Sequence, residues 1–521
     1  MSEQMAVQSN TQQLTPGAIA RELFCIDPDR DERAPQLCAE TLLTLAANDY
    51  GPCSADSLKS PKKQRFAIRS LAVKTNFLAG RFEGHAGGDQ MTPAEYGALL
   101  ASAQEIRGSS HLKLAQQMLE GLVDPDTQHG QTGAWLLRPF HESLLWYDAR
   151  TESSNRPGYT VRKVNIRGTG ITLARLLVDP PDKESAELGR AAVAAIKEAL
   201  TAASPLAEIS AKLEGALPRG QSYTTAPALQ DDEREAWERG ADDRLKDFAR
   251  TLCRHAAGVM LQHGASPPAR LWQLRTILAL DLAVHILRTS WEVTETPESD
   301  RYLLLSFGNS PRAADAVRQR SEESYRRARI RLGEATVQTL ARRMHELAEP
   351  STVWSGHFEK RSVLGNVADE NSAANQLARL PIDATREDFL RIARAAVEVA
   401  SYGRASEDGF RVLLESVGAL VGTGQYRFLT ASPDLLAAMV GALSAEMPLS
   451  SREFFAAIRR EWGFVTNQES AAGTSLTAQL DGAGLEHNAR RAEMLMSDAG
   501  LAVGLSDRTT MVGELAAGVV S

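Results

Sequence analysis

The stretch "PPARLWQLRTILALDLAVHILRTS", Pro267 to Ser290, decides what kind of fold this chain adopts. Its apolar residues run almost without interruption from Ile277 to Leu287, and the whole segment is too long for an ordinary strand. A helix that is apolar on all sides is buried, and burial requires other helices around it. The sequence therefore predicts a mainly α-helical protein built around this segment.

Helical patterns lie on both sides of this central segment. Apolar residues recur three and four positions apart in Pro35–Asn48, in Ser185–Leu200 and in roughly Asp231–His263. The last block, Asp383–Val520, is again helical in pattern. These helices supply the partners that the central segment needs.

Two regions predict small β inserts. Between Gly133 and Asp179, the runs "WLLRPF", "SLLWYDA", "TVRKVNIRG" and "ITLARLLVD" are rich in β-branched and aromatic residues, and "RGTG" supplies turn glycines. We expect a small antiparallel sheet there. The runs "WEVTETP" and "RYLLLSFG" predict a short β-hairpin over about residues 291–307. The expected fold class is mainly α and multi-domain, with one or two small antiparallel β inserts.

The length of 521 residues predicts about three domains. Residues 1–15 are polar and read as a disordered tail, and the Pro-, Gly- and Thr-containing stretch "LPRGQSYTTAPALQ" reads as a linker. The expected parts are a helical domain over 16–217 with its β insert at about 133–179, a long-helix domain over 231–347, and a C-terminal helical domain over 383–521.

The composition indicates in which compartment the protein is found and which class of partner it binds. A net charge of −8 argues against bulk binding of polyanions, so any contact with nucleic acid requires a local basic patch. The four cysteines form no C-x-x-C pair, which predicts reduced thiols and neither metal nor cofactor. Because the N-terminus lacks a secretory signal and no apolar run approaches a membrane span, we expect a cytoplasmic protein without membrane contact. The preference for Arg over Lys, with abundant Ala, indicates a bacterial source.

A local basic patch does occur, in "LLLSFGNSPRAADAVRQRSEESYRRARIRL", Leu303 to Leu332. Its helical part carries seven arginines against three acids, Asp315, Glu322 and Glu323. The arginines are Arg312, Arg318, Arg320, Arg326, Arg327, Arg329 and Arg331. At 100° per residue, one narrow stripe faces the protein: Val317, Ser321, Ser324, Tyr325, Ala328 and Leu332.

The broad cationic face of this helix has three interpretations. It binds acidic protein, it binds nucleic-acid phosphates, or it is a solvated surface in which Glu322 pairs with Arg326, and Glu323 with Arg326 or Arg327. The start of the helix is an anion candidate in its own right, at Gly308, Asn309 and Ser310. Ser310 is the expected N-cap there, and an ordinary capped helix start is the alternative.

A second candidate surface lies near the C-terminus. A helix capped by Ser450 or Ser451 should end at Gly463. A later helix, from about Leu485 to Gly500, is followed by two short extended runs, which is the order of a winged-helix-like end. On that helix we expect four residues to be exposed and to contact a partner: His487, Asn488, Arg490 and Arg491.

The charge of this C-terminal segment favours protein over DNA as its partner. From Ser451 to Ser521 there are six Arg and nine Asp or Glu, whereas a winged helix that reads DNA is normally basic. The alternative is an ordinary helical cap with a small hairpin.

Catalytic signatures are absent from the sequence. It contains no H-E-x-x-H, G-x-S-x-G or Walker motif. The acids and lysine of "DPPDKE", Asp179 to Glu184, resemble a nuclease metal site in residue type but not in spacing. The expected function is therefore a non-enzymatic scaffold or adaptor subunit of a larger, possibly nucleic-acid-associated assembly, with a protein as its main partner. The alternative is a hydrolase or nuclease whose site is assembled from sequence-distant residues.

Overall fold

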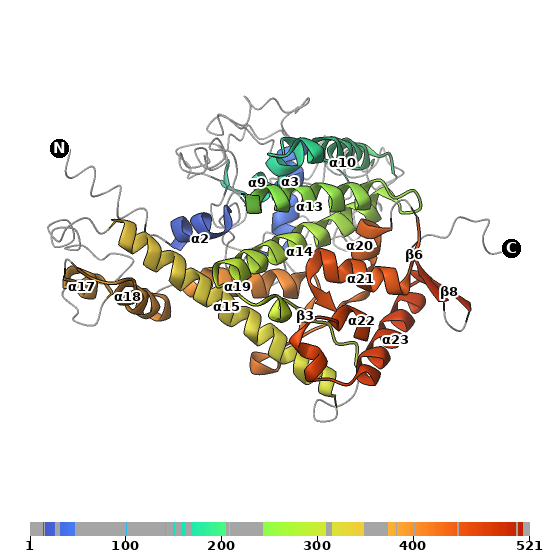
Figure 1. The fold of residues 1–521 in the computed structure, drawn as a ribbon. Coiled ribbons are helices and arrows are strands. Elements are labelled where there is room, and N and C mark those ends of the chain that lie inside the picture. Colours follow the sequence, from blue (N-terminus) through green and yellow to red (C-terminus); the bar gives the residue numbers. More distant parts are fainter. Residues whose placement is uncertain are drawn as a thin grey trace. The chain divides into compact units, whose positions relative to one another are not determined.

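The structure is a computed structural model of the 521-residue chain, shown in Figure 1. It describes residues 14, 16–26, 32–46, 101, 141, 149–151, 159–161, 169–204, 208, 243–308, 315–347, 373–381, 383–399, 402–444, 447–506 and 509–513. These residues are mainly helical, with a few short strand pairs, which confirms the predicted fold class.

The chain divides into two compact units, each assembled from segments that are distant in the sequence. Unit 1 comprises Met1–Glu32, Leu280–Pro433 and Ser450–Thr510. Unit 2 comprises Arg33–Ala279, Asp434–Leu449 and Met511–Ser521.

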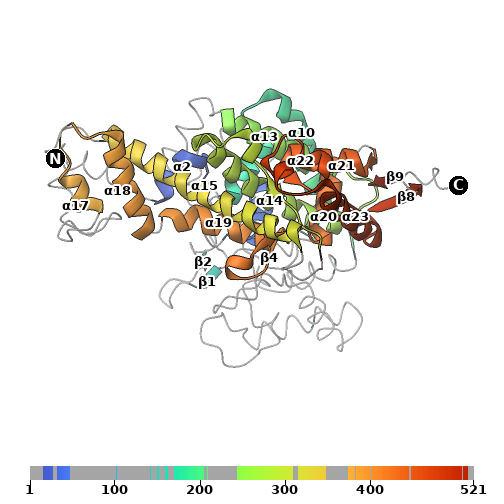
Figure 2. The same cartoon turned by 60° about the horizontal axis from the view of Figure 1, so that its bottom comes forward.

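The elements of unit 2 are mostly helices from the first half of the chain. They are α3 (Ala34–Ala46), β1 (Ala149–Thr151), β2 (Tyr159–Val161), α9 (Thr169–Val178), α10 (Lys183–Thr201), α13 (Asp243–Met260), the first part of α14 (Pro267–Val293) and α20 (Pro433–Leu443). In this unit α10 packs on α13 (Figures 1 and 2), and α9 packs on α3 (Figure 1).

Unit 1 contains the rest of α14 and most of the second half of the chain. Its helices are α2 (Pro16–Phe24), α15 (Ala316–Leu347), α17 (Ala373–Ala378), α18 (Arg386–Val399), α19 (Tyr402–Ser416), α21 (Ser451–Trp462), α22 (Gln468–Ala471) and α23 (Gly482–Asp498), with 3-10 turns η4 (Glu298–Asp300), η6 (Gly424–Tyr426) and η7 (Ser475–Ala478). The short strands within this unit are β3 (Leu303–Leu304), β4 (Leu420–Val421), β5 (Phe428–Leu429), β7 (Phe464–Val465) and β8 (Ala502–Ser506). Strands β6 (Leu449–Ser450) and β9 (Thr509–Val512) have residues in both units.

The central helix α14 is buried as its sequence predicts. Every residue from Ile277 to Leu287 is buried, including two polar ones. The carboxylate of Asp281 accepts a hydrogen bond of 2.7 Å from Nε1 of Trp462, and Nε2 of His285 lies 2.7 Å from the carbonyl oxygen of Phe24. A buried polar group is tolerated only when it is hydrogen-bonded, and these two are.

Helix α15 is the long yellow helix of Figure 1, and it organises unit 1. Its inward stripe is buried as predicted: Val317, Ser321, Ser324, Tyr325, Ala328 and Leu332. Its C-terminal half packs on α17 and α18 in one apolar cluster, in which Leu340 and Met344 meet Phe389 and Ile392. The helix runs to Leu347.

The hairpin predicted over 291–307 is wrong. Trp291 to Val293 form the last turn of α14, and Leu303 and Leu304 pair in parallel with Phe464 and Val465. Trp291 is 5% exposed, so packing of this side chain extends the helix through residues that also suit a strand. The partner of β3 lies some 160 residues further on in the chain, so the residues next to β3 do not indicate which strand it pairs with.

The insert predicted over Gly133–Asp179 is correct in one part and wrong in another. Strands β1 and β2 pair antiparallel, with Ala149 opposite Val161. The run "ITLARLLVD" is not a strand, because Thr169 to Val178 form helix α9. The buried carboxylate of Glu40 accepts a hydrogen bond of 2.9 Å from the N–H of Gly170, which caps the start of this helix. The other runs of the predicted sheet lie outside the described residues.

The predicted helix ends in the C-terminal part are confirmed. Ser450 caps α21 in a capping box with Glu453, and Gly463 ends this helix with φ 75°. Helix α23 ends at Asp498, and Gly500 follows it with φ 71°. Positive φ values of this kind favour glycine, which is why the two helix ends were readable from the sequence.

Candidate partner-binding surfaces

Most arginines of α15 are bound to the protein itself. Nη1 of Arg320 lies 2.5 Å from the Oε2 of Glu323, and Nη2 of Arg329 lies 2.8 Å from Oε2 of Glu407 on α19. Arg318 lies 3.7 Å from the Glu322 carboxylate and packs over the ring of Phe428, 4.3 Å from its centroid. These side chains are therefore committed to contacts within unit 1.

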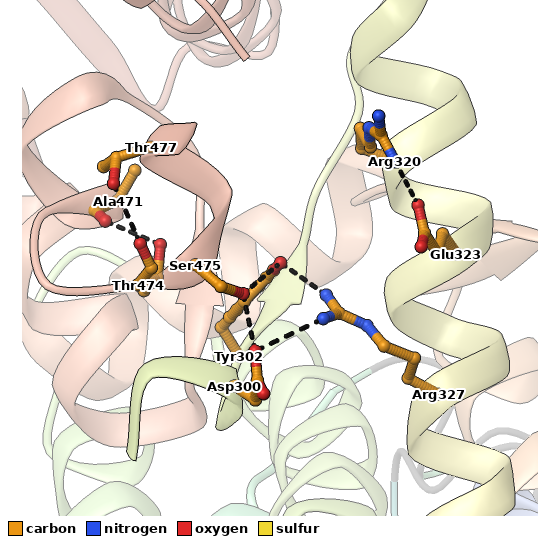
Figure 3. Close-up of polar contacts among 9 residues, drawn as sticks. All are labelled: Asp300, Tyr302, Arg320, Glu323, Arg327, Ala471, Thr474, Ser475 and Thr477. Carbon is orange, nitrogen blue, oxygen red and sulfur yellow. Dashed lines mark hydrogen bonds and ion pairs between the residues drawn. The ribbon is translucent and has the colours of Figure 1, made fainter. Parts of the chain in front are cut away.

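A fourth arginine, Arg327, belongs to the polar cluster shown in Figure 3. Its Nη1 lies 3.4 Å from Oδ1 of Asp300, and its Nη2 donates a hydrogen bond to the hydroxyl of Tyr302. The Ser475 hydroxyl donates to the same Asp300 oxygen at 2.5 Å and lies 3.5 Å from the Tyr302 hydroxyl. This mutual bonding joins α15 to η4 and η7, so the cluster holds unit 1 together.

Two arginines of α15 differ from these four. Arg326 is exposed and Arg331 is half-buried, and neither forms an ion pair with any residue that the structure describes. Between them lies Ile330, whose side chain is 60% exposed. We call Arg326, Ile330 and Arg331 the α15 outer patch.

The ion pairs expected for Arg326 are not the ones formed. The solvated interpretation pairs Glu322 with Arg326, and Glu323 with Arg326 or Arg327. In the structure Glu322 pairs with Arg318, and Glu323 pairs with Arg320. Both acids thus turn toward the preceding helical turn. The part of the cationic face without ion pairs in the described residues is consequently smaller than the sequence suggests. It consists of Arg326 and Arg331, which lie on either side of Ile330.

The start of α15 is occupied by a carboxylate of the protein. The helix begins at Ala316, and Oδ1 of Asp315 accepts a hydrogen bond of 2.9 Å from the N–H of Arg318. Oδ2 of Asp315 lies against Gly308 and fills the place where a Cβ would stand. In the described residues Asp315 thus occupies the cap position of α15, and a further anion there would meet the Asp315 charge.

Three of the predicted residues at this helix start lie outside the described residues. They are Asn309, Ser310 and Arg312.

The structure separates the four candidate residues of α23. Asn488 is 3% exposed and is not a partner residue. Its Nδ2 donates to the carbonyl oxygens of Leu305 and Thr466, both at 2.9 Å, and its Oδ1 accepts from the N–H of Phe307 at 2.8 Å. One side chain thus joins α23 to the segments that follow β3 and β7.

The other three candidates lie on the outer side of α23. His487 and Arg490 are exposed and Arg491 is half-buried. Helical spacing places Met494, which is 65% exposed, on the same side. We call His487, Arg490, Arg491 and Met494 the α23 outer patch.

Sequence reasoning missed the apolar members of both patches. Ile330 and Met494 each stand three or four positions from an arginine, on the polar face of their helix. An apolar residue at a position that the helical pattern assigns to solvent was the available signal.

Two strands follow α23 in the expected order. Strand β8 neighbours β9 in one sheet. The winged-helix assignment stays a prediction, because this order alone does not define that fold.

The acidic turn after α9 has a structural role. Asp182 is the N-cap of α10, where it accepts hydrogen bonds from the N–H of Glu184 at 3.2 Å and from the hydroxyl of Ser185 at 2.9 Å. Oδ2 of Asp182 also lies 3.2 Å from Nε of Arg250. The bond from Ser185, followed by that from Glu184, lowers the pKa of Asp182. This carboxylate is already used in the way that helix caps are used.

The thiols and the acidic residues point to no metal centre in the described part of the chain. Cys38 and Cys253 are buried free thiols, Cys25 is a half-buried one, and burial raises the pKa of Cys253 to about 12. No group of three or more His, Cys, Asp or Glu residues in the described ranges could hold a metal ion. None of the described helices is long and apolar enough to cross a membrane.

Comparisons with known proteins add no relative to this description. No family model, no curated protein and no solved structure matches the chain.

Proposed function

We propose that the protein is a non-enzymatic scaffold or adaptor subunit that docks a protein partner on the α15 outer patch. The observation that carries the proposal is Ile330, a large apolar side chain that is 60% exposed between two arginines without ion pairs in the described residues. The centres of protein interfaces are more apolar than their rims and are enriched in arginine, which is the combination that this patch presents.

The chemistry of the patch favours protein over nucleic acid. Nucleic-acid binding relies on many phosphate contacts, and four of the six described arginines in the Arg318–Arg331 stretch are engaged within the protein. An acidic, amphipathic segment would instead place an apolar side chain on Ile330 and carboxylates beside Arg326 and Arg331. Arginine binds carboxylates through two parallel hydrogen bonds, which adds specificity.

The α23 outer patch repeats this combination of cations with one exposed apolar residue. Met494 takes the place of Ile330, and Arg490 and Arg491 take the place of the two arginines. Methionine suits adaptable binding surfaces because its side chain is flexible and polarisable. Two such surfaces in one unit suit a subunit that joins partners.

A photo-crosslinking experiment in the native host tests the proposal. A photoreactive residue replaces Ile330 in the full-length chain, and the control chain carries it at Leu188, which is also on a helix and 39% exposed. We expect one protein to crosslink at position 330 and not at position 188. Equal crosslinking at the two positions would contradict the proposal.

The identified protein then permits a quantitative test. Ile330→Asp and the double change Arg326→Glu with Arg331→Glu should each weaken its binding at least about thirtyfold, which corresponds to the roughly 2 kcal/mol of an interface hot spot. Arg391→Glu is the matched control, because Arg391 is an exposed helical arginine of the same unit. If the two patch variants bind as the parent does, the α15 outer patch is an ordinary solvated surface.

A further inference from the structure

Strand β8 pairs with a described strand on one side only. In the order of its sheet, β9 is its one neighbour among the strands that the structure describes, so β8 is an edge strand. Figure 1 shows it past the C-terminal end of α23. An edge strand presents a row of backbone N–H and C=O groups that can pair with a further strand.

The residues of β8 do not protect this edge. Val503 is 42% exposed and Leu505 is 49% exposed, and their spacing of two places both side chains on the same face of the strand. Gly504 between them is exposed, and a Cβ added there would meet no described atom within 4 Å. Natural sheets usually protect an edge with lysine, proline or another charged residue, but Ala502–Ser506 contain none of these. Nothing in the sequence of β8 therefore opposes the pairing of another strand.

The chemistry of β8 defines the strand that fits beside it. Aliphatic side chains gain most from aliphatic side chains directly opposite, whereas a charged residue in that place would lose water without gaining a partner. A matching strand therefore has apolar residues two positions apart, a small residue between them and no charge. The sequence of β8, "AVGLS", itself meets all three requirements.

We infer that β8 is a self-association surface, which pairs antiparallel with β8 of a second copy of this chain around a two-fold axis at Gly504. A two-fold interface must be self-complementary, because the same residues face it from both sides. With Gly504 opposite its own copy, Val503 of each chain stands opposite Leu505 of the other chain. The pairing thus forms two equal aliphatic pairs on one face and brings no charged residues of the two strands together.

The size of the contact predicts a weak dimer. A stable interface buries roughly 1,200 Å² or more, and two paired strands of five residues each form a smaller contact than that. We therefore expect an equilibrium between monomer and dimer that depends on protein concentration, and sedimentation velocity of the full-length protein measures it. Leu505→Lys alters both aliphatic pairs and should weaken the association about tenfold or more. Leu188→Lys is the matched control, because Leu188 is a leucine that is 39% exposed on another helix, and it should leave the association unchanged.

Disulfide cross-linking tests the register of the pairing. Residues directly opposite in an antiparallel pair have Cα atoms about 4.5–5.5 Å apart, which a disulfide can span. Gly504→Cys should therefore give a covalent dimer on oxidation, because position 504 faces its own copy. Val503→Cys is the control, since position 503 lies diagonally from its own copy, at a Cα distance of roughly 8 Å that a disulfide cannot span. The parent chain under the same oxidant measures the contribution of the native thiols.

Circular dichroism shows whether Leu505→Lys is folded. If it is not, Val503→Lys takes its place, because it alters the same two aliphatic pairs. A parent that stays monomeric at every concentration, a lysine variant that associates as the parent does, or equal covalent dimer from the two cysteine variants would each overturn the inference. Oligomers larger than a dimer would overturn it as well, because a two-fold pairing is complete with two copies.

Discussion

Replacement of Asn488 by alanine should destabilise unit 1 strongly, although the residue lies on a helix whose outer side is solvated. The change removes two hydrogen bonds of 2.9 Å to the carbonyl oxygens of Leu305 and Thr466, and one of 2.8 Å from the N–H of Phe307. The side chain is 3% exposed, so water cannot replace it without a rearrangement of the segments that it joins.

The size of the effect follows from the backbone groups that lose their partner. A buried polar group left unsatisfied costs about 1–3 kcal/mol. The Phe307 N–H belongs to a half-buried residue and can reach water, which leaves the two carbonyl groups as the main contribution. We therefore expect a loss of about 3 kcal/mol in the free energy of unfolding. In a domain of about 150–250 residues this lowers Tm by about 6–12 °C.

Differential scanning fluorimetry of the full-length chain measures this shift, with His487→Ala and Arg490→Ala as controls. Both control residues are exposed on α23, and their loss should change stability by no more than about 0.5 kcal/mol. A second variant, Asn488→Asp, keeps the shape but places a carboxylate beside two carbonyl oxygens, so it should be at least as unstable as the alanine variant. A Tm for Asn488→Ala within about 2 °C of that of the parent would refute the structural role of Asn488. Asn488 would then again be a candidate for contact with a partner.

Three further outcomes are expected. Trp462→Phe removes the 2.7 Å hydrogen bond to the buried Asp281 carboxylate and should lower the free energy of unfolding by about 2–4 kcal/mol. Urea denaturation measures this change, and an unchanged midpoint would contradict the prediction. Burial raises the pKa of Glu407 above its ordinary value, so the folded state binds this proton more tightly than the unfolded state does. The parent should therefore lose stability as the pH rises from the ordinary glutamate pKa to the raised pKa of the folded state. Glu407→Gln should lack this part of the pH dependence, and identical profiles of the two proteins would disprove it. Gly463→Ala places a residue with a Cβ at a backbone φ of 75° and should lower the free energy of unfolding by about 1–2 kcal/mol, measured by thermal unfolding. Gly504→Ala, whose added Cβ meets no atom within 4 Å, should leave this free energy unchanged.

Several features of the fold could be predicted because their causes are local. The burial of α14 follows from its unbroken apolar run, and the inward stripe of α15 follows from the 100° rotation per residue. The ends of α21 and α23 follow from a capping serine and from glycines at positive φ. In each case, neighbouring residues along the chain determine the conformation.

Tertiary structure decided the features whose causes are distant in the sequence. The run at Thr169–Val178 is rich in residues that suit a strand, but it is a helix whose first turn is capped by Glu40, some 130 residues away. Strand β3 pairs with β7 rather than with the segment before it. Strand propensity is weak, and packing overrides it when a buried partner exists.

The candidate sites show the same division. The sequence alone determined that α15 has one packing face and a broad face rich in arginine, because helix geometry and residue type suffice for both. Only the tertiary structure decided which arginines are engaged, because Asp300 and Glu407 reach Arg327 and Arg329 from other elements. The physical reason is that an ion pair forms with whichever charge the fold brings within about 4 Å, and that distance is set by packing rather than by spacing along the chain.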